Sequence, residues 1–361
     1  MTLPRTDLLL VGAGHGHLHL LRHAGELVAA GYRVRLLAPA TFDYSGVASA
    51  TAAGGLSVEE GRTDVCGLAA RAGVDHTVAT LVGLDTARRT ATTSDGTELT
   101  YDVLSLNVGS VVAPSGMTVH PSTLTVKPLS GLADLDPRIR RVGRPADVTV
   151  VGGGASGLEL AAHLAVHPDV GSVHLVEAGE RIGPDLPAGA RRRLQRLLAA
   201  RGVQVLTGWQ VHEVAERAVV RADGTTLPHD LALLATGLAA PGLLADVGLG
   251  DRHGVPVRAT LQHPDHPEIH AVGDCAHFLP APLPRIGVHG VRQGPVLLCS
   301  LVARSRGAAL PVYEPQRHAL AILDLGAGTG LAVRGRWWWC GTSALRLKRW
   351  IDRRWIRSHR A

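Results

Sequence analysis

Two glycine-rich turns constrain the fold of this chain more strongly than any other feature. They lie in LLLVGAGHGHLHLL (residues 8–21) and in VTVVGGGASGLELAAHL (residues 148–164). Each turn follows an apolar run of strand length and precedes a helical pattern. Strand, tight glycine turn and helix in this order form the dinucleotide-binding unit of a Rossmann fold. We therefore expect an α/β protein built on two Rossmann-like domains.

The second turn carries the complete GxGxxG pattern, with Gly152, Gly154 and Gly157 in place. These glycines allow a tight turn, close approach of the backbone to a pyrophosphate, and close packing of the helix on the strand. The next predicted strand, VHLVEAG, brings Glu177 to its end. An acid there can bind both ribose hydroxyls and repel a 2′-phosphate, so we expect NADH to be preferred over NADPH, although Glu177 alone does not exclude NADPH.

The first turn is incomplete, because His17 stands where the third glycine of the pattern belongs. Its second strand, YRVRLLAP, ends without an acid for a ribose. Four histidines near this turn raise the idea of a metal site: His15, His17, His19 and His23. No carboxylate or cysteine lies nearby in the sequence to complete one, so we predict no metal and expect His15 to pack at the helix start.

Three further strand ends follow in a fixed order. YDVLSLNVGS contains Gly109, LALLATG ends in Gly237, and EIHAVGDCAHF carries Gly273-Asp274. This order, over roughly residues 7–301, resembles the two-dinucleotide-binding-domain flavoproteins, which include glutathione reductase, type II NADH dehydrogenases and sulfide:quinone reductases. The motifs GAGHGH, YSG, VKP, VRQGPVL and WIDRRW look most similar to an NADH-dehydrogenase-like module that occurs alone or fused to selenophosphate synthetase.

The resemblance implies a glutathione reductase-like fold that binds FAD at the first turn and NAD(P)H at the second. It implies a split FAD domain (residues 1–112 and 257–314), an NAD(P)H domain (113–256), and a C-terminal hairpin with a basic amphipathic helix (315–361). The residues that it assigns to FAD are Gly12, Ala13, Gly14, His15, Ser45, Gly109, Gly273 and Asp274. Those that it assigns to NAD(P)H are Gly152, Gly154, Gly157, Glu177 and Gly237. FAD stays bound through many contacts, so its turn tolerates an altered glycine, whereas NADH must dock and leave.

The chain lacks the cysteine pair that disulfide reductases of this superfamily hold against the flavin. Its cysteines are isolated in the sequence: Cys66, Cys275, Cys299 and Cys340. We therefore expect direct hydride transfer from NADH to FAD and then transfer to another acceptor.

Three residues are candidates for roles in the reaction. Glu159 is expected on the nicotinamide side by resemblance to type II dehydrogenases, with a solvated helix residue as the alternative. Lys127 is one of only two lysines beside 35 arginines, and it is either a compact cation near the flavin or there by chance. Gln293 is the only glutamine in GVHGVRQG (residues 287–294). Type II dehydrogenases carry a pair of glutamines in the matching stretch, and Val288 and Arg292 stand in their places here.

The C-terminal segment concentrates basic and aromatic residues. Residues 336–361 contain eight basic residues, one acid and five of the six tryptophans. Leu347, Trp350, Ile351 and Trp355 share a helical stripe, which is typical of a helix lying on an anionic membrane. A helix packed on its own domain or on a second subunit remains the alternative. Because the basicity is confined to this segment, we expect no nucleic-acid binding.

The first twelve residues show no signal-peptide pattern, and no apolar run reaches the roughly 18–20 residues of a membrane span. We therefore expect a cytoplasmic protein, with peripheral attachment to the inner face of the cell membrane through residues 336–361.

The function that we predict is transfer of hydride from NADH through FAD to a quinone-type or other small acceptor. Alternatives are a soluble reductase for a protein or for a selenium or sulfur compound, and a redox-sensing binding protein; a homodimer stays open. We also expect that deleting residues 336–361 releases the protein from anionic vesicles and leaves FAD bound.

Overall fold

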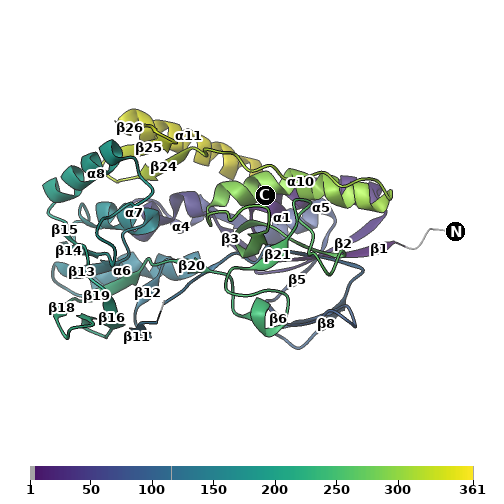
Figure 1. Ribbon diagram of the computed structural model, residues 1–361, viewed down its shortest axis with the longest axis horizontal. Helices are drawn as coiled ribbons and strands as arrows, with labels where there is room; N and C mark the ends of the chain where they lie inside the picture. The colour runs from purple at the N-terminus through teal and green to yellow at the C-terminus, as the bar shows by residue number, and fades with distance from the viewer. Residues whose placement is uncertain (1–4, 115, 361) are drawn as a thin grey trace.

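The computed structural model describes residues 5–114 and 116–360 (Figure 1). The description leaves out residues 1–4, 115 and 361. Residues 1–4 belong to the predicted FAD domain, and residue 361 belongs to the predicted C-terminal helix. Two parallel five-stranded sheets lie along the long axis of the molecule, and a C-terminal layer runs across both (Figure 1). The predicted fold class, α/β with two Rossmann-like domains, is confirmed.

The first sheet has the strand order β22-β9-β1-β2-β5, and all its neighbours are parallel. Its strands are β1 (Thr6–Val11), β2 (Tyr32–Ala38), β5 (Asp75–Val78), β9 (Val103–Leu106) and β22 (Ile269–Ala271). Leu8, Leu9 and Leu10 are fully buried, as expected for a strand covered on both faces. Helices α2 (Ala24–Ala29) and α5 (Val65–Ala72) contact strands of this sheet, and α1 (His15–Arg22) and α10 (Gly287–Ser305) pack against each other beside it.

The second sheet has the order β12-β19-β13-β14-β15, again all parallel. Its strands are β12 (Leu124–Thr125), β13 (Ala146–Val151), β14 (Val170–Val176), β15 (Gln204–Leu206) and β19 (Leu231–Leu234). The helices beside it are α6 (Leu135–Arg141), α7 (Ala155–Leu164) and α8 (Ala188–Ala200). A four-stranded sheet completes this half: β11 (Thr118–Val119), β16 (Val211–Val214), β17 (Ala218–Arg221) and β18 (Thr226–Pro228).

Strand β22 comes after the whole second sheet in the chain, yet it pairs with β9 of the first. The segment that leaves the first sheet for the second contains β10 (Val111–Val112), and the segment that returns contains β20 (Leu238–Ala239). These two strands pair with each other. The domain bounds at residues 112, 256 and 314 stay predictions, since strand pairing does not locate the ends of a domain. The other short strands are β3 (Thr41–Asp43), β4 (Arg62–Asp64), β6 (Leu81–Asp85), β7 (Thr90–Thr93), β8 (Glu98–Thr100), β21 (Val255–Val257) and β23 (Ala276–Phe278). The short helices are η1 (Ser45–Val47), α3 (Ala48–Ala52), α4 (Val58–Gly61), η2 (Leu129–Asp134), α9 (Leu243–Asp246) and η3 (Gly273–Cys275).

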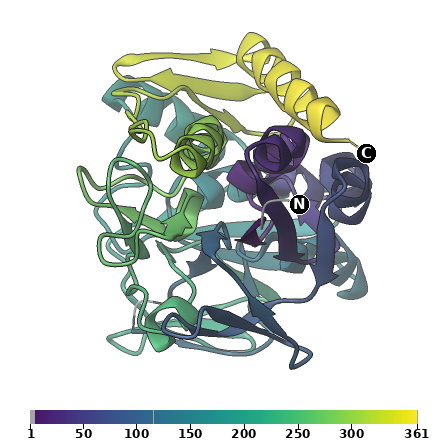
Figure 2. The same ribbon diagram turned by 90° about the vertical axis from the view of Figure 1, so that its right-hand side faces the viewer.

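The C-terminal segment forms an antiparallel sheet and a long helix, where the sequence predicted a hairpin and a helix. The sheet consists of β24 (Ala321–Asp324), β25 (Gly330–Arg334) and β26 (Trp337–Gly341), so the tryptophan run supplies a third strand. Helix α11 (Thr342–His359) then packs on β25 and β24. Figure 2 shows this layer lying over the rest of the molecule.

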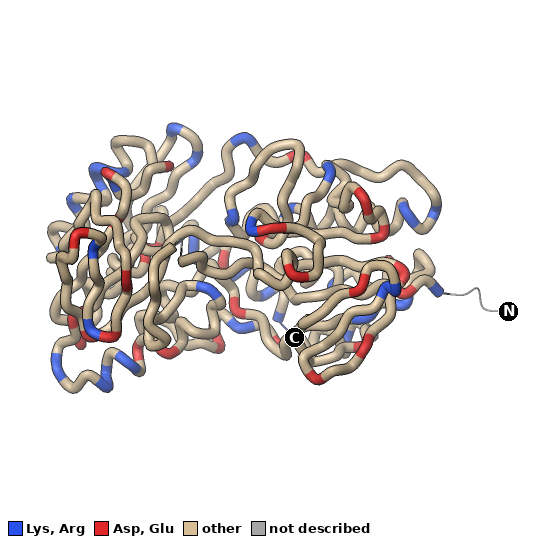
Figure 3. The backbone as a smooth tube through the Cα atoms, turned by 60° about the horizontal axis from the view of Figure 1, so that its bottom comes forward, with Lys and Arg blue, Asp and Glu red and all other residues tan. Residues whose placement is uncertain are grey.

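The body of the molecule carries both charge signs, interspersed along the chain (Figure 3). This distribution contrasts with the largely basic α11. Within the described ranges, no helix is both long enough and apolar enough to cross a membrane.

Candidate functional site

Asn107, at the end of β9, fastens the first glycine turn. Its Oδ1 accepts the backbone N–H of Gly16 (3.0 Å) and of His17 (3.2 Å), and its Nδ2 donates to the carbonyl of Val272 (2.8 Å). One side chain thus connects the start of α1, the end of β9 and the turn after β22. The sequence pattern did not single out this residue, although a signal exists, because Asn107 is the only asparagine in the chain.

His17 occupies the place of the missing third glycine and is fully buried. Its Nδ1 lies 2.6 Å from the carbonyl oxygen of Gly12 and its Nε2 lies 2.8 Å from Ser105 Oγ. Burial lowers the pKa of His17 to about 4, so the ring is neutral at pH 7. Since a carbonyl only accepts, Nδ1 carries the proton and Nε2 accepts from Ser105. The first turn is therefore wide enough for a side chain that stabilises it.

The second turn has no such space. A Cβ on Gly157 would lie 1.9 Å from the carbonyl oxygen of Gly152, and a Cβ on Gly152 would lie 2.4 Å from that of Ala235. Gly152 also has a φ of +117°, which side chains rarely adopt. These contacts explain why the second turn needs glycine at its first and third pattern positions, whereas His17 can occupy the third position of the first turn.

The helix starts at the two turns differ in how their N–H groups are paired. At the start of α1, which follows Gly14, Asn107 Oδ1 already accepts the N–H groups of Gly16 and His17. The start of α7, which follows Gly154, has no side-chain cap, and a Cβ on Gly154 would meet no atom within 4 Å. Unpaired N–H groups and the helix dipole attract phosphate at such an end, so the second turn suits a pyrophosphate, whereas at the first turn the dipole of α1 favours one.

Glu177 lies at the end of β14, beside the second turn, as predicted. Its carboxylate accepts the N–H of Gly153 (2.6 Å) and of Gly179 (2.7 Å). The acid is thus held against the glycine turn at the position from which it can face a ribose. Gly237, also predicted, follows β19, and a Cβ there would meet no atom within 4 Å.

Replacing Glu177 with alanine is expected to lower the preference for NADH over NADPH by a factor on the order of ten or more. The variant removes the negative charge that repels a 2′-phosphate and the acceptor for the ribose hydroxyls. The measurement compares kcat/KM for the two nucleotides with an artificial electron acceptor. Glu180→Ala, which removes an exposed acid three residues later, is the control. An unchanged nucleotide preference in Glu177→Ala would show that this acid does not face the ribose.

Asp274 is the centre of a second polar group, on η3. Lys127 Nζ lies 3.1 Å from Asp274 Oδ2, and Ser110 Oγ donates to the same oxygen (2.8 Å). The side chains of Lys127 and Asp274 are 22% and 12% exposed, so the pair is partly accessible. The structure therefore brings together Lys127 and Asp274, which the sequence singled out separately.

Gln293 lies beneath this group, and its side chain is almost completely buried. Its Oε1 accepts the N–H of Gly273 at 2.6 Å. Gly273 has a φ of +71°, and a Cβ there would approach Asn107 Nδ2 to 2.6 Å. In this position Gln293 supports the turn that carries Asp274.

His15 and Ser45 converge near the start of α10. A Cβ on Gly287 would lie 3.4 Å from His15 Cε1 and 3.5 Å from Ser45 Oγ. The His15 ring contacts Tyr44 (5.7 Å between centroids) and Trp355 of α11 (5.0 Å), and burial lowers the pKa of His15 to about 4. His15 thus packs at the helix start.

The four histidines of the first turn do not converge on one point. The rings of His19 and His23 lie 4.4 Å apart, and His23 Nδ1 lies 2.9 Å from Glu26, whereas His17 points to Ser105. In the part of the chain that the structure describes, no group of three or more His, Cys, Asp or Glu residues is arranged to hold a metal ion.

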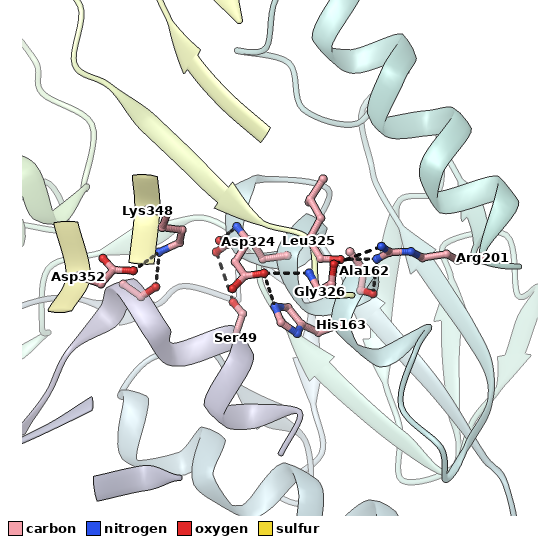
Figure 4. A network of polar contacts seen from close by, with 11 residues as sticks. Ser49, Ala162, His163, Arg201, Asp324, Leu325, Gly326, Lys348 and Asp352 are labelled. Atoms are coloured by element: carbon pink, nitrogen blue, oxygen red, sulfur yellow. Dashed lines mark hydrogen bonds and ion pairs between the residues drawn. The ribbon is translucent and has the colours of Figure 1, made fainter. Parts of the chain in front are cut away.

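Glu159, on α7, is half-buried and packs against the β24–β25 turn instead of lying on a fully solvated helix face. Its Oε1 accepts the N–H of Asp324 (2.7 Å), and Ser49 Oγ lies 3.4 Å from its Oε2. Burial raises the pKa of this carboxyl group. One turn further along α7, His163 Nε2 lies 3.2 Å from Asp324 Oδ1 (Figure 4).

A cavity of about 720 Å³ adjoins this network, between α3, α7, the β24–β25 turn and α11. Its apolar lining includes Val47, Ala50, Ala53, Leu56, Val166 and Ile356. Its polar lining includes His163, His167, Asp324, Asp352, Arg353 and Arg357. The volume is typical of sites for small organic ligands. We call it the tail cavity, because α11 forms one of its walls.

The inner face of α11 is fastened to the first domain by polar and aromatic contacts. Asp352 Oδ2 lies 3.0 Å from Lys348 Nζ, and its Oδ1 accepts from the hydroxyl of Tyr44 (3.0 Å); Lys348 also donates to the carbonyl of Gly46. Trp355 stacks on Tyr44, with 4.4 Å between ring centroids. The predicted apolar stripe is therefore split: Trp355 faces inward while Trp350 is 60% exposed. Since α11 packs beside His15, deleting the tail would disturb the first turn, and the expectation that FAD stays bound no longer follows.

All four cysteines are free thiols. Cys275 is completely buried, and burial raises its pKa to about 11, so it is not a reactive thiolate at pH 7. Cys66 and Cys299 are exposed, on α5 and α10.

The chain has a dinucleotide turn on each of two parallel sheets, and the first sheet takes strands from before and after the second sheet in the sequence. This arrangement is typical of nucleotide-dependent oxidoreductases with two Rossmann-like domains. The family described as pyridine nucleotide-disulphide oxidoreductase matches residues 6–294, and the chain belongs to this family. FAD and NAD(P)H are the cofactors of the family, and the two turns fit them. The protein is therefore an NAD(P)H-dependent flavin oxidoreductase that lacks the cysteine pair to which the family's name refers.

Individual relatives resemble the chain over most of its length. Ferroptosis suppressor protein 1 of Taeniopygia guttata is 24% identical over 265 residues, which cover 70% of this chain and 69% of that protein. NADH dehydrogenase-like protein YutJ of Bacillus subtilis is 22% identical over 259 residues, covering 70% and 72%. The structure of NDH2 from Plasmodium falciparum in complex with NADH superposes with a TM-score of 0.84 at 14% identity, covering 97% of this chain and 96% of that one. At this identity the superposition shows the shared fold alone.

Proposed function

We propose that this protein oxidises NAD(P)H, with NADH preferred, and reduces a quinone-type acceptor through FAD without a redox disulfide. The observation that carries this proposal is the tail cavity, which lies beneath a helix with an aromatic and basic outer face. A lipid-dissolved acceptor could enter this cavity from the surface on which the helix rests. A relative named as an NADH dehydrogenase-like protein is consistent with such a reaction.

The outer face of the C-terminal layer suits a membrane surface. The indole of Trp338 lies against Gly189 of α8, so strand alternation turns Trp337 and Trp339 to the other side. Trp337 is 83% exposed. The exposed arginines of α11 are Arg346, Arg349, Arg353, Arg354 and Arg357. Tryptophan prefers the membrane interface and arginine prefers anionic headgroups, so the two features support the same orientation.

The roles that we propose for the site residues follow their positions. FAD would lie along Gly12, Ala13, Gly14, His15, Ser45, Gly109, Gly273 and Asp274, and would supply the hydride-accepting ring when bound. NAD(P)H would lie along Gly152, Gly154, Gly157, Glu177 and Gly237. Lys127 would balance the charge of Asp274 beside FAD, Gln293 would hold the Gly273 turn, and Glu159 would be a half-buried acid near the reacting rings.

A soluble reductase for a protein or for a selenium or sulfur compound is the second candidate. The sequence of α10 favours this candidate. Val288 and Arg292 stand where type II NADH dehydrogenases carry a pair of glutamines, and Gln293 is buried beneath η3. In that case the outer face of α11 would bind a second subunit or a protein partner instead of lipid.

The experiment that tests the proposed function separates the two half-reactions. The purified protein is mixed with NADH without oxygen, and then with a short-chain ubiquinone or menaquinone analogue, while flavin absorbance is followed. We expect bleaching by NADH and prompt recovery with the quinone. Bleaching without recovery would retain the FAD and NADH sites and refute the quinone acceptor.

Replacing both Trp337 and Trp350 with aspartate is expected to weaken binding to phosphatidylglycerol vesicles by about tenfold or more while FAD stays bound. The substitutions remove interfacial aromatics and add negative charge on the outer face, and they leave the inner contacts of Lys348 and Trp355 intact. Vesicle flotation measures the bound fraction, and absorbance measures FAD. Leu279→Asp, at another exposed apolar position, is the control. Equal vesicle binding by the double variant would contradict membrane attachment.

A further inference from the structure

The tail cavity contains a histidine–carboxylate pair to which no role has been assigned. His163 projects from α7, one helical turn after Glu159, and lines the cavity together with Asp324. Its side chain is 10% exposed, and its Nε2 lies 3.2 Å from Asp324 Oδ1. Glu159 in turn holds Asp324, because its carboxylate accepts the backbone N–H of Asp324. His163 therefore lies beside a carboxylate whose backbone is held by Glu159.

The second ring nitrogen of His163 lies beside Gly326 of the β24–β25 turn, which has no side chain to place over it. A Cβ on Gly326 would lie 3.2 Å from His163 Nδ1, and Gly326 itself lines the cavity. Gly326 has a φ of +67°, and its N–H donates to Asp324 Oδ1 (2.9 Å). The β24–β25 turn thus fastens Asp324 and at the same time keeps a side chain off the Nδ1 edge (Figure 4).

Asp324 is suited to balance a positive charge on His163. Burial raises the pKa of Asp324, but the hydrogen bond and charge of His163 and the N–H of Gly326 outweigh burial, and the pKa is lowered on balance. The carboxylate is therefore ionised at pH 7. In such a dyad the carboxylate orients the ring while the imidazole transfers the proton.

Reduction of a quinone to a quinol by NADH requires a proton that NADH does not supply. The hydride carries two electrons and one proton, so NADH, one further H⁺ and the quinone give NAD⁺ and the quinol. That further proton must reach a quinone oxygen in a cavity that is partly closed from water. Such closed sites usually provide a positioned acid for the transfer.

We propose that His163 donates this proton from Nδ1 to an acceptor bound in the tail cavity, with Asp324 as the positioning residue. This inference rests on the proposed quinone reaction. The Nδ1–H bond breaks, an O–H bond of the quinol forms, and the neutral imidazole regains a proton from solvent through the mouth of the cavity. Asp324 stays ionised throughout, and no additional oxidant or reductant is needed.

Other charged groups face this pair and are retained in the variants below. The groups on the surrounding elements are Glu60 on α4, Glu159 on α7, His167 after α7, Lys348, Arg349, Asp352, Arg353 and Arg357 on α11, and Arg360 after α11. His167 is already paired, because its Nε2 lies 3.0 Å from Asp136, and it lacks a contact to Asp324. We therefore assign the transfer to His163.

The test follows the two half-reactions in His163→Gln and Asp324→Asn. We expect flavin bleaching by NADH at the wild-type rate, and reoxidation by a short-chain quinone slowed on the order of a hundredfold in His163→Gln, as is typical of removing a general acid. Reoxidation by ferricyanide, which takes electrons without a proton, should be unchanged. The dependence of quinone reoxidation on pH should differ between His163→Gln and the wild type. His212→Gln, on an exposed strand position, is the control.

Two further measurements separate proton donation from a structural role. In His163→Ala, added imidazole should restore part of the rate of reoxidation by quinone, because the cavity can admit it. The dissociation constant of the quinone, measured on the oxidised variants, should stay within about twofold of the wild type. Wild-type reoxidation kinetics and an unchanged pH profile in His163→Gln would overturn this inference alone. A wild-type protein that no quinone reoxidises would overturn the proposed function instead.

Discussion

Replacing Gly157 with alanine is expected to abolish reduction of the flavin by NADH while FAD remains bound. The added methyl group would lie 1.9 Å from the carbonyl oxygen of Gly152, which belongs to the turn itself. Backbone atoms on both sides must move, so the turn that would receive the pyrophosphate loses its shape. A distortion of about 3 kcal/mol or more corresponds to an affinity loss of about a hundredfold or more. The measurement is the rate of anaerobic flavin bleaching over a range of NADH concentrations.

Gly25→Ala is the matched control for this prediction, because a Cβ at that position in α2 meets no atom within 4 Å. It should bind and oxidise NADH as the wild type does. The variant Gly157→Ala must also be shown to fold, through its FAD content and its unfolding transition. If Gly157→Ala retains FAD and is bleached by NADH at wild-type concentrations and rates, the second turn is not the nucleotide-binding turn.

Replacing Asn107 with alanine is expected to produce a protein that loses FAD and much of its stability. The substitution leaves the N–H groups of Gly16 and His17 and the carbonyl of Val272 without their partner. Each of the three buried groups left unpaired costs about 1–3 kcal/mol, so the total loss is roughly 3–9 kcal/mol. That amount is a large part of the roughly 5–15 kcal/mol by which a typical domain is stable. Denaturant unfolding and the ratio of bound flavin to protein measure the two effects.

Gln262→Ala provides the comparison, since the amide of Gln262 also bonds a backbone carbonyl, that of Pro267 (2.8 Å), but at an exposed site. Its loss should cost less than about 1.5 kcal/mol and leave FAD in place. Asn107→Asp should fall between the two, because the carboxylate still accepts both N–H groups but cannot donate to Val272. A stable, yellow Asn107→Ala protein would show that the first turn is held by other contacts.

The sequence could predict those parts of the site in which residues close in the chain cooperate. A strand, a glycine turn and a helix form one local unit, so the pattern around Gly152 and Gly157 predicted the second turn, and the acid at the next strand end predicted the place of Glu177. The same rules found the first turn, although they did not show how His17 could replace a glycine. Its ring needs Ser105, which arrives from another strand.

Residues that act through distant partners could not be interpreted in this way. Lys127 and Asp274 each stood out in the sequence, but only the packing of η3 against the segment after β12 places them 3.1 Å apart. The helical stripe on α11 predicted one apolar face, whereas the contacts with Tyr44 and Gly46 turned Trp355 inward and buried Lys348. Periodicity shows which residues share a face, and it does not show which face meets the rest of the protein.

By itself, the sequence determined the fold class, the family resemblance and the absence of a cysteine pair, because glycine conformations, strand patterns and residue types are properties of short segments. Only the tertiary structure decided that Asn107 fastens the first turn, that α11 covers it, and that His163 and Asp324 meet in a cavity. The physical reason is that these contacts join segments up to about 300 residues apart, where burial and hydrogen bonding depend on how whole elements pack.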